Sequence, residues 1–121
     1  MELSIKSGVL FGVLTPQMVL ANQVVTTVFD KFGWPTIITS GTDGTHALNS
    51  LHYTGNALDY RTVALGIPAA QITLIATALQ TALGPQYLVI KESNHIHVQF
   101  GLAVSVGSAA RFAKIMAQQG G

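Results

Sequence analysis

Apolar residues recur at helical spacing in the first third of the chain. Thr15 and Pro16 precede an apolar stripe, and Gly33 follows it. Threonine is a favoured N-cap, proline suits the first helical position, and residues three and four apart share one face of a helix. We therefore predict a buried helix from Thr15 to near Gly33. Its core-facing residues are expected to be Val19, Leu20, Val24, Val28 and Phe29.

A second apolar pattern of helical period begins at Pro68 and ends at Gly84. Proline again suits the first turn, and glycine suits the residue that follows a helix. The pattern predicts a second helix packed against the core. Its inward-facing residues are expected to be Ile72, Ile75, Ala76, Leu79 and Leu83.

Four short segments have the composition of strands, because β-branched and aromatic residues gather between turn-forming residues. They are residues 36–39, 57–63, 87–91 and 95–100. Ser93 and Asn94, between the last two, suit a tight hairpin turn. The order helix, strand, loop, strand, helix, hairpin favours an α+β domain with a small, mostly antiparallel sheet flanked by helices.

The length of 121 residues fits a single domain that buries its own core. We expect this core to span about residues 8–101 and the C-terminal tail, 102–121, to contain a helix between Ser105 and Gln119. The segment 40–49 is rich in Gly, Thr, Asp and Asn, and long polar loops of this kind commonly carry function.

Charged residues make up only 9% of the chain, and the net charge is +1. This balance argues against a nucleic acid partner, which would require a basic surface. The chain has no cysteine, so disulfides, thiolate zinc sites and cysteine nucleophiles are excluded. Any metal must be held by His, Asp or Glu.

Two uncharged runs, 7–29 and 67–90, raise the possibility of a signal peptide or a membrane span. In the first run, Pro16 marks a helix start, and the preceding Lys6 is offset by Glu2. We therefore expect no signal peptide and no membrane span, in a chain made in the cytoplasm. The second run is interrupted by Gln71, Gln80, Gly84, Pro85 and Gln86.

All four histidines and three of the five acidic residues lie in two windows, 43–59 and 92–97. His95 and His97 are two apart on a predicted strand, so their side chains leave the same face and can reach one point in space. The first window contributes His52 and Asp59, in a segment that suits a loop leading into a strand.

Two imidazoles and one carboxylate leave a fourth position for water, which is the ligand count of a catalytic zinc site. Peptide hydrolysis at such a site requires one further group, a proton shuttle. Glu92 is the candidate, since the hairpin reversal can bring it beside the metal. His95, if it is not a ligand, could donate a hydrogen bond to the developing oxyanion.

The segment from Ser50 to Asp59, with sequence SLHYTGNALD, resembles the Ser-x-His-x-x-Gly-x-Ala-x-Asp signature of the zinc D-Ala-D-Ala peptidase superfamily. This superfamily includes D-Ala-D-Ala carboxypeptidases, L-alanyl-D-glutamate endopeptidases of phage lysins and the related hedgehog fold. The segment from Glu92 to His97 resembles its second motif, His-x-His on a strand with an upstream acid. The resemblance extends from Thr15 to Phe100.

By this resemblance, His52, Asp59 and His97 bind zinc, while Glu92 and His95 have catalytic roles. The resemblance also implies a hedgehog/DD-peptidase-like fold and the function of a zinc metallopeptidase that cleaves peptidoglycan stem peptides. A bacteriophage endolysin, acting on the bacterial cell wall, would have this activity.

The arginine that many family members carry upstream of the first motif, and that binds the substrate carboxylate, is missing here. Asp43 and His46 occupy that loop instead, and Arg61 could substitute if it reaches the cleft. We therefore favour an endopeptidase over a carboxypeptidase. Ser50 is expected to hydrogen-bond within the motif loop, and with these three residues it forms the predicted substrate-binding side.

Other interpretations remain open at this stage. The histidines could be unrelated residues at a polar strand end, His95 could only orient the site, and Glu92 could be an exposed charge paired with Lys91. An alternative function is a catalytically degenerate, zinc-containing domain that binds the cell wall or serves as a structural phage component.

Overall fold

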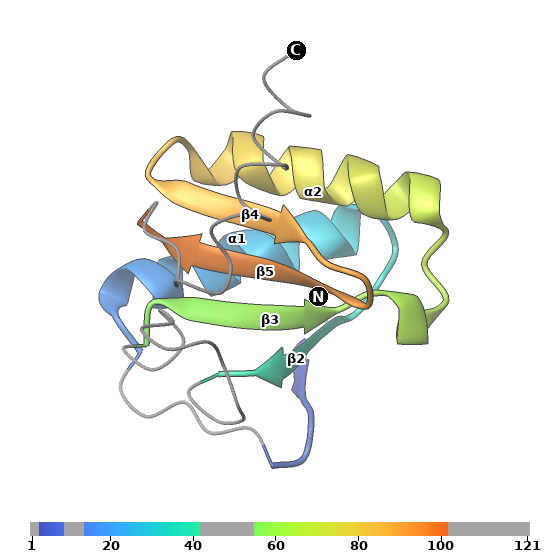
Figure 1. Cartoon of the computed structure of the whole chain (residues 1–121), viewed down its shortest axis with the longest axis horizontal. Coiled ribbons are helices and arrows are strands. Elements are labelled where there is room, and N and C mark those ends of the chain that lie inside the picture. Colours follow the sequence, from blue (N-terminus) through green and yellow to red (C-terminus); the bar gives the residue numbers. More distant parts are fainter. Residues whose placement is uncertain (1–2, 9–13, 42–54, 102–121) are drawn as a thin grey trace.

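The structure is a computed structural model that describes residues 3–8, 14–41 and 55–101 (Figure 1). Within these residues the chain forms two α-helices, one short 3-10 helix and a five-stranded sheet, which confirms the predicted α+β class. The elements are β1 (Leu3–Ile5), α1 (Pro16–Lys31), β2 (Thr36–Ser40), β3 (Ala57–Arg61), η1 (Val63–Leu65), α2 (Ala69–Leu83), β4 (Tyr87–Lys91) and β5 (His95–Phe100).

The strands are ordered β1-β2-β3-β5-β4 across the sheet. β1 pairs with β2 in parallel, and the other neighbours pair antiparallel, as expected for a mostly antiparallel sheet. The hairpin prediction is confirmed, because the Glu92 amide donates to the His95 carbonyl at 2.9 Å and closes the turn at Ser93 and Asn94. The predicted strand 57–63 ends at Arg61, since the chain turns there into η1.

Helix α1 begins as predicted, with the Thr15 hydroxyl accepting a hydrogen bond from the Met18 amide at 3.3 Å. The predicted stripe is wrong at Val19 and Leu20, which are 49% and 58% exposed. Each of these two residues lies one or two positions after Met18, so it is turned away from the buried side of the helix. The side chains that α1 buries are Met18, Ala21, Val25, Thr26, Val28 and Phe29.

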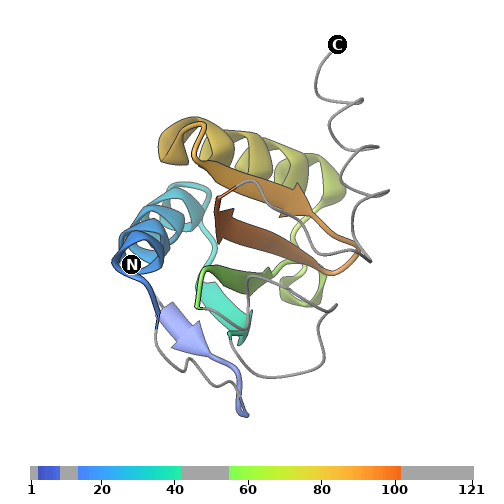
Figure 2. The same ribbon diagram turned by 60° about the vertical axis from the view of Figure 1, so that its left-hand side comes forward.

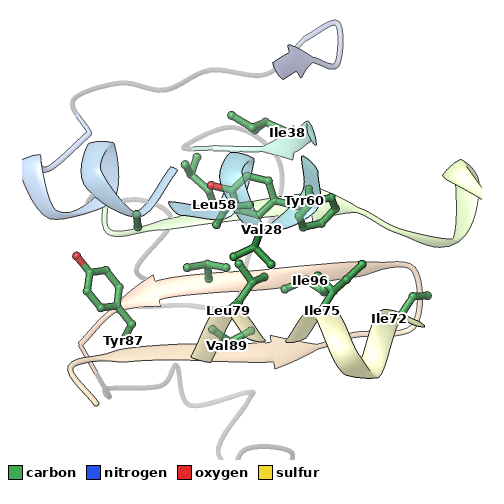
Figure 3. Packing of buried hydrophobic residues seen from close by; sticks show 14 of the residues in the cluster. Val28, Ile38, Leu58, Tyr60, Ile72, Ile75, Leu79, Tyr87, Val89 and Ile96 are labelled. Atoms are coloured by element: carbon green, nitrogen blue, oxygen red, sulfur yellow. The ribbon is translucent and has the colours of Figure 1, made fainter. Parts of the chain in front are cut away.

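Both helices pack on the same face of the sheet (Figures 1 and 2). Figure 3 shows Val28 of α1 and Leu79 of α2 meeting over Tyr60 of β3 and Ile96 of β5. The predicted inward side of α2 is confirmed, with Ile72, Ile75 and Leu79 buried and Ala76 and Leu83 packed against the core.

Strand alternation places the polar residues of the second motif on the other face of the sheet. On β5, Ile96 and Val98 belong to the core beneath the helices, so His95 and His97 lie on the opposite face. We call this face, which carries Asp59, Arg61, His95, His97 and Gln99, the site face. No helix in the described ranges has the length and apolar character needed to span a bilayer.

Candidate functional site

Asp59 and His97 face each other across the two central strands of the sheet. The register pairs Asp59 of β3 with His97 of β5, and Arg61 with His95. The hairpin in turn places Glu92 opposite His95. Paired residues of antiparallel strands project from the same face, so Arg61, His95 and Glu92 form a row beside the Asp59–His97 pair. The structure thus brings together two short stretches of the sequence, 59–61 and 92–97, that lie far apart along the chain.

The Asp59 carboxylate lies between two imidazoles. Its Oδ1 atom is 3.0 Å from Nδ1 of His97 and 3.6 Å from Nε2 of His95. The side chains of Asp59 and His97 are only 10% and 14% exposed, whereas that of His95 is 28% exposed. His95 also lies 2.6 Å from the Asn94 side-chain oxygen through its Nδ1 atom. His97 is therefore both closer to the carboxylate and less exposed to solvent than His95.

The pKa of His97 is raised above the ordinary 6.5. Burial is the largest single influence and acts to lower the pKa, because it disfavours the charged ring. The hydrogen bond and charge of Asp59 outweigh burial, with further contributions from a hydrogen bond to Gln99 and the charge of Glu92. The site is thus arranged to hold a positive charge at His97, which a bound cation could replace.

Two donor atoms of the predicted zinc site are close enough to share a metal. In a tetrahedral zinc site with bonds of about 2.0–2.1 Å, neighbouring ligand atoms are about 3.3 Å apart. The 3.0 Å between Asp59 Oδ1 and His97 Nδ1 is close to this value. Among residues 3–8, 14–41 and 55–101, however, no three His, Asp or Glu side chains group together as a metal site. The third predicted ligand, His52, lies outside the described residues, as do Asp43, His46 and Ser50.

The residues that flank the segment 42–54 are held by different elements. Ser40, near its start, pairs with Asp59 at a β-bulge, where the Thr39 hydroxyl donates to the Asp59 carbonyl at 3.5 Å. Gly55, at its end, has φ +75°, as expected from the unusual backbone angles that this loop requires. The Gly55 carbonyl accepts from the Thr15 amide at 3.2 Å, which ties the loop end to the start of α1. The segment that contains His52 therefore leaves the sheet beside Asp59 and rejoins the described chain at the start of α1 and β3.

Glu92 lies on the site face, while its neighbour Lys91 lies on the helix face. The Lys91 ammonium donates to the Thr73 hydroxyl of α2 at 3.0 Å, so it is engaged away from Glu92. The charge of Glu92 also contributes to the raised pKa of His97, in keeping with its place on the same face of the sheet. This placement does not support the interpretation of Glu92 as a charge paired with Lys91.

Gln99 is a site residue that sequence reasoning missed. Its Oε1 atom lies 2.7 Å from Nε2 of His97, and its Nε2 atom donates to the Gly101 carbonyl at 2.9 Å. Glutamine is a rare zinc ligand, so a search for metal-binding types passes over it. The available signal was its position two residues after His97, which places it on the same face of a strand.

Comparison of the chain with protein-family models, curated proteins and solved structures gave no match in any of the three. Function is therefore inferred from the chemistry of the two motifs and from the geometry that brings them together.

Proposed function

We propose that the chain is a zinc metallopeptidase with a hedgehog/DD-peptidase-like fold that hydrolyses peptide bonds in peptidoglycan stem peptides. One observation carries the proposal: Asp59 and His97 from the two motifs place their ligand atoms 3.0 Å apart, with Glu92 on the same face. The resemblance of both motifs to the zinc D-Ala-D-Ala peptidases supports the substrate class.

In this proposal His52, Asp59 and His97 hold the zinc ion. Zinc, when bound, supplies a Lewis acid that polarises a substrate carbonyl and lowers the pKa of water to about 7. His52 lies three residues before Gly55, so at most about 10 Å of chain separates it from the residue that precedes β3, the strand that carries Asp59. The donor set of two imidazoles and a carboxylate fits a catalytic zinc site.

The chain's own groups perform the proton transfers. Glu92 accepts a proton from the attacking water and passes it to the leaving amine, as a general base and then a general acid. His95, which is more exposed than His97 and lies in the same row as Glu92, donates a hydrogen bond to the oxyanion that forms on the carbonyl.

Arg61 is the candidate for holding a substrate carboxylate. It is half-buried at the end of β3 and pairs with His95, so it lies on the site face. Because Arg61 enters from β3 and not from the loop that carries the family's arginine, we favour cleavage within a stem peptide over removal of a terminal residue. Asp43, His46 and Ser50 would contribute from the motif loop.

Cleavage by variants at Glu92 and Lys91 tests the proposal. Zinc-loaded protein is incubated with purified peptidoglycan, and new amino termini are counted. Glu92→Gln should lower the rate by about 100-fold or more while keeping zinc bound, since the proton shuttle is lost. Lys91→Gln, a neighbouring change on the helix face, should retain the wild-type rate.

Two outcomes would argue against the proposal. Unchanged cleavage by Glu92→Gln would remove Glu92 from the mechanism. Stoichiometric zinc without cleavage of any peptidoglycan type would instead favour a degenerate domain that binds the cell wall or has a structural role.

A further inference from the structure

The Gln99 side chain connects His97 to the end of β5. Gln99 is only 4% exposed and lies on the same face as His97. Its amide makes two short contacts, one of 2.7 Å from Oε1 to His97 Nε2 and one of 2.9 Å from Nε2 to the Gly101 carbonyl. A buried amide that spans a ring nitrogen and a main-chain carbonyl has little freedom to rotate.

The Gly101 carbonyl fixes which end of the Gln99 amide faces His97. A carbonyl oxygen can only accept a hydrogen bond, so the amide nitrogen of Gln99 must point to Gly101. The amide oxygen is then left facing His97, and an amide oxygen can only accept. Nε2 of His97 must therefore carry a hydrogen and donate it to Gln99.

This hydrogen bond decides which ring nitrogen of His97 meets the carboxylate. With Nε2 held by Gln99, Nδ1 is turned toward Asp59 at 3.0 Å. A ring flipped by half a turn would lose both contacts. In metal sites, the hydrogen bond made by the second nitrogen sets both the tautomer and the orientation of a histidine ligand.

We propose that Gln99 is a positioning residue that holds His97 with Nε2 protonated and Nδ1 directed at the metal position beside Asp59. The proposal rests on the proposed function for the role of His97 as a ligand. It assigns to Gln99 a task that neither sequence motif identifies.

The experiment compares Gln99→Met, Gln99→Glu and Gln71→Met with the wild type. Methionine keeps the length of the side chain but removes the acceptor, whereas glutamate keeps an acceptor for His97. Gln71→Met is the matched control, because the Gln71 oxygen also accepts from a ring N–H, that of Trp34 at 2.9 Å, on the helix side of the sheet. Two properties are measured: the His97 ring N–H signals of the metal-free protein by NMR, and the zinc Kd by competition with a chelator.

In the wild type and in Gln71→Met, we expect a slowly exchanging Nε2–H signal from His97. The signal should persist in Gln99→Glu and disappear in Gln99→Met. Zinc Kd should rise by about 10–100-fold in Gln99→Met and by less than about threefold in Gln99→Glu and Gln71→Met.

A wild-type protein without the protected Nε2–H signal would overturn the proposal, as would a Gln99→Met protein that keeps both the signal and the wild-type Kd. If the wild type binds no zinc, the proposed function fails, and the NMR comparison still decides the role of Gln99. The role of Gln99 and the proposed function can thus fail independently, because the NMR measurement requires neither zinc nor substrate.

Discussion

The contact between Asp59 and His97 is the residue-level feature on which the site depends. Asp59 offsets the effect of burial on His97 and keeps its pKa above 6.5. Zinc binding requires the unprotonated ring nitrogen, so metal and proton compete for Nδ1. The same contact therefore links the pH dependence of the metal-free protein to the affinity of the site.

Asp59→Asn removes the charge while keeping the side-chain size. We expect it to lower the pKa of His97, because the carboxylate then no longer offsets the lowering effect of burial. In the metal-free wild type, the folded pKa is above the unfolded value of 6.5. The protonated ring therefore stabilises the fold fully below pH 6.5, and this contribution is lost as the pH rises through the folded pKa.

NMR titration of His97 and urea unfolding across this pH range provide the measurements. Asp59→Asn should lower the His97 pKa and flatten the loss of stability above pH 6.5. An unchanged His97 pKa in this variant would show that the carboxylate does not act on the ring as the structure indicates.

Among single residues, the sequence identifies those whose side chains commonly bind metals, but not those that only position them. The spacing of His95 and His97 indicated a shared face, and the structure places them so. Gln99 could not be selected in the same way, because its role depends on a contact with the Gly101 carbonyl that its residue type alone does not reveal. The bulge at Thr39 likewise has no local sequence signal.

At the scale of elements, the N-terminus of α1 and the end of the motif loop are joined. The Thr15 hydroxyl caps the helix at the Met18 amide, and the Thr15 amide donates to the Gly55 carbonyl. The helix start is therefore tied to Gly55, which follows the segment that contains His52. In the proposed site, α1 would contribute through this connection and not through a catalytic residue.

Thr15→Ala removes the cap and should lower the free energy of unfolding by about 1 kcal/mol, whereas Thr15→Ser, which keeps the hydroxyl, should lose only a few tenths. Urea unfolding of both variants checks this expectation. Equal losses in the two variants would mean that the hydroxyl is not the stabilising group.

Gly55→Ala tests the loop end directly. Alanine at a positive φ costs about 1–2 kcal/mol, so this variant should be destabilised. Gly66→Ala is the matched control, since Gly66 has φ +85° and open space around an added Cβ, and it lies after η1, outside both motifs. Both variants should lose stability in urea, but only Gly55→Ala should also raise the zinc Kd. A comparable rise in both would refute the link between Gly55 and the metal position.

The elements themselves were largely predictable because their signals are local. Thr15, Pro16 and Gly84 marked helix ends, and Ser93 and Asn94 marked the hairpin. β1 was missed, since three residues are too few to show a period. Val19 and Leu20 were wrongly predicted to be buried. In α1 they belong to an apolar stripe beside the one that contains Met18, Ala21 and Val25, and the sequence pattern does not show which of the two stripes faces the core.

At the scale of the whole molecule, the contact between Asp59 and His97 depends on strand order. Asp59 and His97 are 38 residues apart and meet only because β5 inserts between β3 and β4. The helices and the core lie on one face of the sheet, and Asp59, His97 and Gln99 lie on the other (Figure 2). Strand order is a non-local property, so the sequence motifs could indicate which residues act together but not how the sheet joins them.

Zinc should stabilise the whole fold, because its ligands come from strands that are distant in sequence. At a free zinc concentration 100 times the Kd, the expected gain is about 2.7 kcal/mol. Thermal unfolding with zinc, and again after a chelator is added, measures this gain. A melting temperature that does not respond to either treatment would contradict a metal site that spans the sheet.

Zinc stoichiometry tests whether His52, Asp59 and His97 form a metal site. The bound metal is measured by elemental analysis in the purified wild type, in His52→Ala and in Lys91→Gln, with folding checked by circular dichroism. We expect one zinc ion per chain in the wild type and in Lys91→Gln, and a loss of zinc in folded His52→Ala. A wild type without zinc, or a His52→Ala protein that keeps it, would contradict the proposed metal site.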